Sequence, residues 1–476
     1  MAVSAATPAG AAQVQFDAEL IGRMSQQGPR YTSYPAADRF SGTFGAGDYL
    51  EAVSGLRATG QAKPLSLYFH IPFCESLCYY CACNKIITRD HGKAEVYLGY
   101  LMREIDMQAR LFEGMRRVEQ LHFGGGTPTF LSDAQMGGLM EFIGSRFDIA
   151  PDEAGEYSIE IDPRTVDAER IPSLRAQGFN RISLGVQDFD PEVQKAVNRI
   201  QPEHLTRNAI QAARDSGYRS ISIDLIYGLP KQSLVTMEQT LAKVIDTSPD
   251  RISIYNYAHM PQLFKSQKLI LDEDLPSAAA KLDMLALCID RLTDAGYVYI
   301  GMDHFAKPTD DLALAQREGR LHRNFQGYST HAETEMVSCG VSAISAVGGI
   351  YSQNEKSLDK YYERLDRNEL PIARGLRLGR DDHLRRNIIQ LLMCDFELSI
   401  EAIERAWGIS FDAYFAAELT KLERLEADGL LDMGRKSIRV TPRGRLLIRN
   451  ICMVFDRYLG MGHEIKLERM RYSKTI

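Results

Sequence analysis

Short hydrophobic runs recur along the chain between about residue 65 and residue 257. The clearest are rich in β-branched and aromatic residues: LSLYFHI, VEQLHF, YSIEI, RISLGV, SISIDLI and RISIYNY. Their apolar content on both faces is typical of parallel strands that are covered by helices. Amphipathic stretches, such as residues 94–112 and 205–218, separate these runs and predict the helices.

This alternation predicts an α/β fold built from at least six β–α units with right-handed crossovers. A parallel (β/α) barrel, or part of one, is the favoured arrangement, and a doubly wound open sheet is the alternative. A barrel would place functional residues at the carboxyl ends of its strands. Polar residues or glycines do follow the predicted strands: the segment 74–83, GGGTPT at 124–129, Glu160 and Asp162, Gln187, Asp224, and Tyr257–Ala258.

The pattern changes after about residue 375, where helical segments precede a short hairpin predicted at SIRVTPRGRLLI. This is the layout of a winged helix. Basic residues near the predicted wing would suit DNA binding: Arg435, Lys436, Arg439 and Arg443. We favour a lid or packing module instead, because the segment at the recognition position, FAAELTKLERLEADG, is too acidic for a phosphate backbone.

We therefore expect three consecutive regions. Residues 1–60 would form a disordered leader and an N-terminal arm that contacts substrate, residues 61–370 the barrel with an extension, and residues 371–476 a C-terminal, mainly helical, winged-helix-like domain. The Ala-rich start, MAVSAATPAGAAQVQ, has neither the basic nor the apolar region of a signal peptide. No apolar run approaches the ~18 residues that cross a bilayer. We expect a cytoplasmic protein.

Composition narrows the function classes. The chain has 476 residues, of which 45% are hydrophobic and 25% charged, as in ordinary globular proteins. A formal net charge of −7 argues against a general binder of polyanions. Four of the eight cysteines are dispersed among apolar neighbours and are expected to be buried: Cys288, Cys339, Cys394 and Cys452.

The other four cysteines lie together in CESLCYYCAC. Cys74, Cys78 and Cys81 have the spacing C-x3-C-x2-C, which lets three thiolates on one loop reach three corners of a 4Fe–4S cubane. Zinc also accepts thiolates, but a structural zinc site would usually need a second distant pair, which this sequence lacks. Cys83 follows Cys81 too closely to reach a separate corner comfortably. The spacing therefore favours a cluster with one open iron, which could bind the amino and carboxylate groups of a methionine-derived cofactor.

GGGTPTF directly follows a predicted strand and lacks the Gly-Lys-Ser/Thr ending of a P-loop. Consecutive glycines expose backbone amides, which suits pairing with the ammonium and carboxylate of an amino-acid cofactor. Charged and amide side chains follow on later strands: Glu160, Gln187, Arg199 and Asp224. Carboxylates can hold ribose hydroxyls or an ammonium, and an arginine can clamp a carboxylate. Each could singly be a solvated loop charge or a helix cap.

HIPFCESLCYYCACNK followed by GGGTPT resembles the radical S-adenosylmethionine (SAM) enzymes. More narrowly, the chain is similar to the family of oxygen-independent coproporphyrinogen III oxidases, over nearly its whole length. Further segments carry this resemblance: GPRYTSYP, EIDPR, ISLGVQDF, IDLIYGLP, YIGMDHFA, LHRNFQGYST and GVSAIS. Two departures are Tyr80, at a position that is often phenylalanine, and MVSCG at 336–340, which is less glycine-rich than expected.

The resemblance implies one 4Fe–4S cluster held by Cys74, Cys78 and Cys81, with Cys83 outside its coordination. It also implies two molecules of SAM. The one bound to the cluster would contact Tyr68, Tyr80, Gly125, Glu160 and Ile344. The second would contact Gly126, Thr127, Gln187, Arg199, Asp224 and Ala258.

The implied reaction belongs to anaerobic haem biosynthesis. The reduced cluster cleaves SAM, and the resulting 5′-deoxyadenosyl radical takes a hydrogen atom from the β-carbon of a substrate propionate. Loss of carbon dioxide and of one electron to an acceptor leaves a vinyl group, and two rounds convert coproporphyrinogen III to protoporphyrinogen IX. Four substrate carboxylates require cations and donors, for which the candidates are Arg30, Tyr31, Arg323 and Gln326.

The expected partners are an external, flavodoxin-like electron donor and an unknown acceptor, with no nucleic acid and no membrane, and the expected state is a monomer. Other functions stay open: a haem-binding or haem-delivery protein, a radical enzyme acting on another tetrapyrrole, or a redox-sensing regulator that binds DNA. The segment GPRYTSYP and Cys83 favour the enzyme over haem delivery.

Overall fold

The computed structural model describes residues 14–60, 63–167 and 169–459. The first 13 residues of the Ala-rich leader lie outside them. Contacts divide the chain into two compact units. The barrel unit comprises Ala37–Cys288 and His331–Gly379, and the C-terminal unit comprises Met1–Ala36, Ile289–Thr330 and Arg380–Ile476. This grouping joins segments that are distant in sequence, unlike the three consecutive regions expected above.

The barrel unit is built on a sheet whose parallel strands are neighbours in chain order. These strands are β1 (Leu65–Ile71), β4 (Arg117–Gly125), β6 (Glu156–Ile161), β7 (Arg181–Gln187), β8 (Ser220–Tyr227) and β9 (Arg251–Asn256). A doubly wound sheet would reverse this order at its switch point. The prediction of a partial parallel barrel is confirmed, and the doubly wound alternative is wrong.

On the other side of β1 the sheet changes direction. β14 (Glu335–Cys339) pairs with β1 in parallel, and β15 (Ile344–Val347), β16 (Ile350–Asn354) and β17 (Ile372–Arg377) follow in antiparallel order. Among the described strands of this unit, β9 and β17 do not pair with each other, so the sheet stays open.

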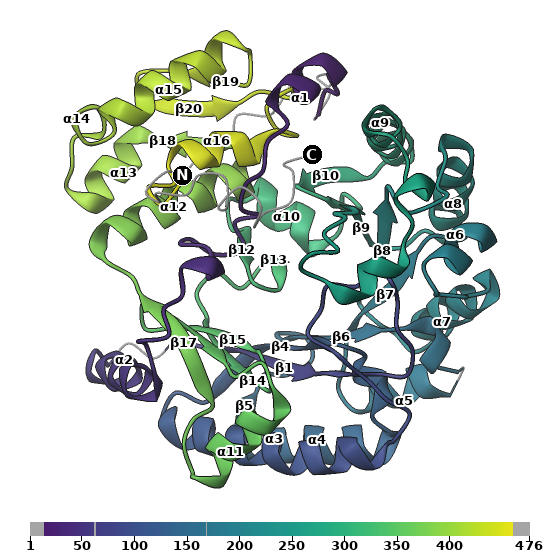
Figure 1. The fold of residues 1–476 in the computed structure, drawn as a ribbon. Helices are drawn as coiled ribbons and strands as arrows, with labels where there is room; N and C mark the ends of the chain where they lie inside the picture. The colour runs from purple at the N-terminus through teal and green to yellow at the C-terminus, as the bar shows by residue number, and fades with distance from the viewer. Residues whose placement is uncertain (1–13, 61–62, 168, 460–476) are drawn as a thin grey trace. The chain divides into compact units, whose positions relative to one another are not determined.

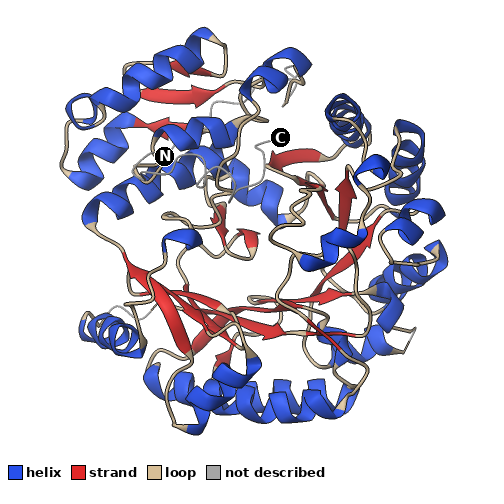
Figure 2. Ribbon diagram, viewed as in Figure 1, coloured by secondary structure: helices blue, strands red, loops and turns tan. Residues whose placement is uncertain are grey.

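Helices cover the outer face of the parallel strands (Figures 1 and 2). They include α3 (Gly92–Leu111), α4 (Asp133–Arg146), α5 (Arg170–Ala176), α6 (Pro191–Ala196), α7 (Glu203–Asp215) and α8 (Leu234–Thr247). In α7 the buried residues Thr206, Ala209, Ile210 and Ala213 recur every three or four positions, which gives one face to the sheet. A capping box between Ser132 and Gln135 begins α4.

The C-terminal unit ends in a small α/β module. Its elements are α12 (Arg380–Asp395), β18 (Glu397–Ser399), α13 (Ile400–Trp407), α14 (Phe411–Tyr414), α15 (Ala416–Ala427), β19 (Leu431–Met433), β20 (Ser437–Val440) and α16 (Ile448–Val454). The strand order β18-β20-β19 agrees with the predicted winged-helix-like layout. The hairpin lies earlier than expected, at β19 and β20, because the segment after Val440 turns into α16 rather than into a second strand.

Ion pairs occupy the basic residues near the wing. Arg439 pairs with Glu397 at 2.9 Å and Lys436 with Glu401 at 3.0 Å. Arg443 pairs with Asp17. These pairings leave less positive charge for a phosphate backbone, so they favour the packing interpretation over DNA binding.

The N-terminal arm packs against α16 within the C-terminal unit. Arg449 donates hydrogen bonds to the backbone carbonyls of Gly28 and Pro29. The phenol of the buried Tyr31 donates to Asp456 at 3.0 Å. The same unit contains α1 (Ala18–Met24), α10 (Asp311–Arg317) and the hairpins β10 (Val298–Gly301)–β11 (His304–Ala306) and β12 (His322–Asn324)–β13 (Gly327–Ser329).

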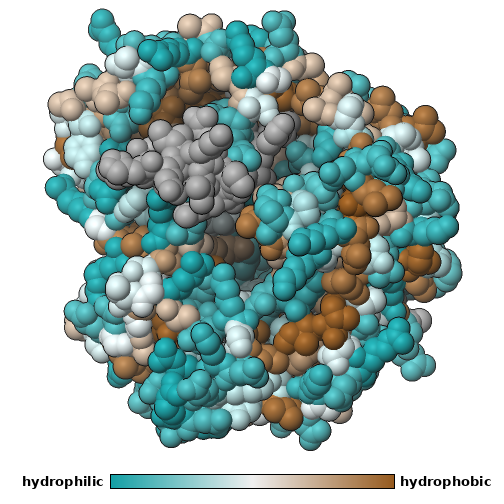
Figure 3. Space-filling model, in the orientation of Figure 1, coloured by the Kyte–Doolittle hydropathy of each residue, from teal (hydrophilic) through white to brown (hydrophobic). Residues whose placement is uncertain are grey.

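Within the residues that the structure describes, no helix is long and apolar enough to cross a membrane. On the face drawn in Figure 3, hydrophilic and hydrophobic residues are interspersed.

Candidate active site

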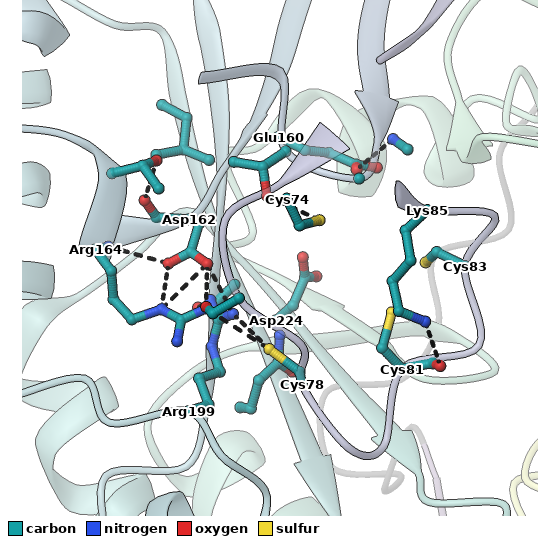
Figure 4. A pocket seen from close by; sticks show the side chains of 18 of the residues that line it. Cys74, Cys78, Cys81, Cys83, Lys85, Glu160, Asp162, Arg164, Arg199 and Asp224 are labelled. Carbon is teal, nitrogen blue, oxygen red and sulfur yellow. Dashed lines mark hydrogen bonds and ion pairs between the residues drawn. The ribbon is translucent and has the colours of Figure 1, made fainter. Parts of the chain in front are cut away.

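A cavity of about 410 Å³ lies at the carboxyl ends of the barrel strands (Figure 4). The cysteine loop after β1, the glycine segment at the end of β4 and the ends of β6, β7 and β8 all contribute to its wall. Most of the predicted site residues line it: Cys74, Cys78, Tyr80, Cys81, Gly125, Gly126, Thr127, Glu160, Gln187, Arg199 and Asp224. Segments that are up to 150 residues apart thus meet where a parallel barrel was expected to bring them together.

Backbone hydrogen bonds anchor the cysteine loop. The strands β2 (Phe73–Cys74) and β3 (Ile86–Ile87) pair in parallel and close the loop at its base. The amide of Tyr79 donates to the carbonyl of Val197 at 3.0 Å, and the Asn198 side chain donates to the carbonyl of Leu77 at 2.7 Å. The loop is therefore held from both its own base and the helix end after β7.

The three spaced cysteines have different surroundings. The Thr127 hydroxyl donates to the Cys74 sulfur at 3.4 Å, while burial raises the pKa of this thiol to about 11. Cys78 is buried, whereas Cys83 is exposed. A hydrogen bond from Cys83, together with the charge of Lys85, lowers the pKa of Cys81 to about 6 despite partial burial.

This arrangement fits a cubane better than a single metal ion. The three sulfurs line one cavity, yet no three His, Cys, Asp or Glu side chains within residues 14–60, 63–167 and 169–459 are grouped as ligands of one ion would be. A cubane presents its irons at separate corners, so its ligands need not converge. Zinc, the alternative that the spacing left open, requires tetrahedral ligands around one point.

Each glycine of GGGT meets a different neighbour. A Cβ on Gly124 would lie 3.0 Å from the Glu160 carboxylate. Gly125 has φ +114°, and a Cβ there would lie 2.6 Å from the His70 ring. A Cβ on Gly126 would lie 2.7 Å from the backbone of the segment 72–73 that leads into Cys74. Gly125 and Gly126 therefore require glycine, whereas a Cβ at Gly124 would displace only the end of the Glu160 side chain. The segment brings the backbone of β4 against the cysteine loop.

Hydrogen bonds across this contact fix its geometry. The Gly126 amide donates to the carbonyl of Ile71 and the Thr127 amide to that of Phe73, both at 2.8 Å. These bonds hold the glycine segment against the start of the cysteine loop.

Two carboxylates face the cavity from β6 and β8. Glu160 accepts a hydrogen bond from the Gly125 amide at 3.2 Å and lies 3.3 Å from His122 Nε2. Partial burial would raise the pKa of Glu160, but the hydrogen bond and charge of His122 hold it below its ordinary value. Burial raises the pKa of Asp224 to about 6, even though Ser183 donates to it at 2.8 Å. Both groups can accept hydrogen bonds from hydroxyl or ammonium donors.

A cluster of opposite charges lies beside Cys78. Arg199 contacts Asp162 at 2.9 Å and donates to the carbonyl of Gly185 at 2.6 Å. Arg164 contacts the same carboxylate at 2.7 Å. Burial would raise the pKa of Asp162, but the two guanidinium groups hold it below its ordinary value. The aspartate is therefore a fixed anion between two cations.

Sequence reasoning missed Arg164, Lys85 and Ser183 as residues of the cavity wall. Arg164 stands in EIDPR, two residues after a strand end that the sequence did single out, so its position offered a signal. Lys85 follows Cys81 by four residues, and its ammonium donates to the Cys81 carbonyl at 2.9 Å. Ser183 lies inside a strand and gave no such signal.

Three residues that the family resemblance assigns to SAM do not line this cavity: Tyr68, Ala258 and Ile344. Tyr68 lies on β1, where its hydroxyl is 3.1 Å from His70 Nδ1 and its ring stacks on His122. Ala258 follows the end of β9, and Ile344 begins β15. Their contacts with a cofactor stay predictions.

The four candidates for substrate binding all belong to the C-terminal unit. Two are engaged: Tyr31 with Asp456, as above, and Arg30 in an ion pair with Asp303. Arg323 lies over the ring of Tyr328 at 4.7 Å. Its Nε and one terminal nitrogen, and Nε2 of Gln326, are buried and have no hydrogen-bond partner within the described residues.

Comparisons with known proteins identify the family of the chain. The family model described as "Radical SAM superfamily" matches residues 68–244, and "HemN C-terminal domain" matches residues 378–447. A relative from Pseudomonas aeruginosa, named oxygen-independent coproporphyrinogen III oxidase, is 51% identical over 463 residues, 97% of this chain and 99% of the relative. One of the same name from Escherichia coli is 51% identical over 464 residues, covering 98% and 99%. The chain belongs to the oxygen-independent coproporphyrinogen III oxidases.

A solved member of the oxygen-independent coproporphyrinogen III oxidases has the same fold. It is the enzyme from Escherichia coli described as "Coproporphyrinogen III oxidase (HemN)" and as a radical SAM enzyme. The TM-score is 0.89 at 49% identity, and the match covers 94% of this chain and all of that one. Membership confirms the predicted enzyme class, and the radical SAM family implies a 4Fe–4S cluster and SAM.

Proposed function

We propose that this protein converts coproporphyrinogen III to protoporphyrinogen IX by oxidative decarboxylation of two propionate side chains to vinyl groups. The observation that carries the proposal is the meeting of the C-x3-C-x2-C sulfurs and the GGGT backbone in one cavity at the strand ends. The relatives that match almost the whole chain bear the name of this activity.

Cys74, Cys78 and Cys81 would hold the cluster, and Cys83 would remain outside its coordination. When bound, the cluster and SAM supply an electron and a carbon-centred radical that removes hydrogen from the substrate. The chain's own residues bind and orient the cofactors. The bare backbone at Gly125 and Gly126 lets an amino-acid moiety approach β4, and Glu160 accepts from its ammonium group.

We assign two SAM molecules to the site. The first would contact Tyr68, Tyr80, Gly125, Glu160 and Ile344, and the second would contact Gly126, Thr127, Gln187, Arg199, Asp224 and Ala258. Eight of these residues line the same cavity. An arginine among them suits a carboxylate, and Asp224 suits ribose hydroxyls.

Arg323 and Gln326 are the strongest candidates for binding a substrate carboxylate. Buried donors without partners are rare in native proteins and suggest a ligand that completes them. Arg30 could serve in the same way only by exchanging Asp303 for a substrate carboxylate, and Tyr31 only by releasing Asp456.

We also propose a flavodoxin-like electron donor, an external acceptor that is still unidentified, and a monomer that acts in the cytoplasm. All eight cysteines are free thiols in the structure, which suits a reducing compartment.

Anaerobic reconstitution tests the function directly. The purified protein would receive iron, sulfide, reductant, SAM and coproporphyrinogen III, and chromatography with mass spectrometry would follow the products. We expect deoxyadenosine, carbon dioxide and a divinyl product. Deoxyadenosine without vinyl product would contradict the substrate, and vinyl products from another tetrapyrrole alone would replace it. Stoichiometric haem binding without turnover would support haem delivery instead.

A further inference from the structure

Cys78 has two cations beside its sulfur, whereas Cys81 has only the charge of Lys85 nearby among the described residues. Arg199 and Arg164 each place a terminal nitrogen near the Cys78 sulfur, at 3.5 and 3.6 Å. Among the residues that the structure describes, the Cys74 sulfur accepts a hydrogen bond from the neutral hydroxyl of Thr127. Figure 4 shows the two guanidinium groups beside Cys78, on the opposite side of the cavity from Lys85.

Asp162 holds both arginines in place. Its Oδ1 accepts hydrogen bonds from the backbone amide and from Nε of Arg164, both at 3.0 Å, and its Oδ2 contacts both guanidinium groups. The side chains of Asp162 and Arg164 are 10% and 18% exposed, so water screens them little. Two cations and one anion leave a net charge of +1 next to Cys78.

We infer that Arg164, positioned by Asp162, sets the electron affinity of the cluster through its hydrogen bond to the Cys78 thiolate. This inference rests on the proposed function, because it takes Cys78 as a ligand of the cluster. Reduction adds one electron from an external donor, which is oxidised by one electron, and no bond or proton moves. The added negative charge lies partly on the ligand sulfurs, so a nearby cation and a hydrogen bond favour the reduced state.

Replacing Arg164 tests the effect on the cluster separately from cofactor binding, whereas replacing Arg199 would not. Arg199 is a proposed SAM contact, so its replacement would change two properties together. Arg164 is not among the proposed contacts, and its guanidinium binds Asp162 and Cys78.

The test is a redox titration of the reconstituted cluster without SAM, followed by electron paramagnetic resonance. In Arg164→Gln we expect the equilibrium constant for one-electron reduction to fall at least about threefold, which lowers the midpoint potential by about 28 mV. Arg164→Lys keeps the charge and should recover part of this loss. Arg175→Gln is the matched control, because Arg175 pairs with Asp152 and neither residue lines the cavity; its potential should not move.

Asp162→Asn provides an independent test with the opposite sign. It removes the anion but keeps the side-chain oxygen that accepts from the backbone amide and Nε of Arg164, so both guanidinium groups should stay beside Cys78 and the midpoint potential should rise. If Arg164→Gln fails to assemble a cluster, the sign of the change in midpoint potential in Asp162→Asn decides whether the inference holds. Unchanged potentials in variants that carry an intact cluster, or a fall in Asp162→Asn, would overturn this inference alone. A wild-type protein that assembles no cluster would overturn the proposed function, and this inference with it.

Discussion

Replacing Gly126 by alanine should separate the glycine segment from the cysteine loop. The new Cβ would lie 2.7 Å from backbone atoms of Pro72 and Phe73, whereas ordinary contacts begin near 3.4 Å. Backbone must therefore shift by about 0.7 Å, which would stretch the two 2.8 Å hydrogen bonds that join these segments. Overpacking costs about 1–3 kcal/mol, and each of the two weakened hydrogen bonds about 1 kcal/mol, so we expect a loss of about 3–5 kcal/mol.

The rate of deoxyadenosine formation should fall by more than the loss of stability explains, because this contact aligns the proposed cluster ligands with the backbone proposed to bind SAM. A misplacement of about 1 Å can cost a factor of about 100 in rate. Thermal unfolding and the rate of deoxyadenosine formation measure the two effects. Gly138→Ala is the control: Gly138 lies in α4, a Cβ there would meet no atom within 4 Å, and alanine should stabilise the helix by up to about 1 kcal/mol. A Gly126→Ala protein with wild-type unfolding temperature and deoxyadenosine rate would refute this reasoning.

Three further predictions concern the cluster, the pH dependence of stability and the substrate. Cys74→Ser should abolish the absorbance of the reconstituted cluster, whereas Cys83→Ser should retain it; a cluster lost in the Cys83 variant would contradict the ligand set. Burial would raise the pKa of Glu156, but the cations around it, with Arg181 at 2.9 Å the foremost, hold it at about 2, against 4.5 ordinarily. The charged form of Glu156 should therefore contribute about 3 kcal/mol above pH 4.5 that is lost as the pH falls towards 2. Glu156→Gln should therefore lower the urea midpoint much more at pH 7 than at pH 3, and equal losses would refute the assignment. Gln326→Leu removes a buried donor without a partner, so the protein should become slightly more stable while KM for coproporphyrinogen III rises about tenfold; an unchanged KM would exclude Gln326 from the substrate site.

The parallel strands were predictable because their segments are short apolar runs rich in β-branched and aromatic residues. LSLYFHI coincides with β1, and the other five runs match strands to within a residue or two at their ends. The antiparallel strands β15, β16 and β17 were not predicted. Their segments ISAV, IYSQN and IARGLR are short and mix polar with apolar residues, so their pairing depends on long-range contacts rather than on a local pattern.

The site was predictable where its residues follow strands, because the carboxyl ends of parallel strands meet at one rim. Glu160, the last residue but one of β6, was found in this way. Asp224 was also found, although it lies inside β8 rather than after it. Arg164 was not, because a charged residue in a turn gains its role only when Asp162 aims it at a sulfur from another segment. Its place in the sequence indicates that Arg164 lies near the rim, but it does not show which sulfur the side chain points toward.

The fourth cysteine shows how spacing and structure combine. Cys83 follows Cys81 by two residues, and from this spacing alone we expected the sulfurs to lie too close together for separate corners of a cubane. In the structure both residues line the same cavity, together with Cys74 and Cys78, and Cys83 is the exposed one of the four. Lining the cavity therefore does not distinguish the fourth cysteine from the other three. The ligand set of Cys74, Cys78 and Cys81 stays a prediction, which the Cys83→Ser variant tests.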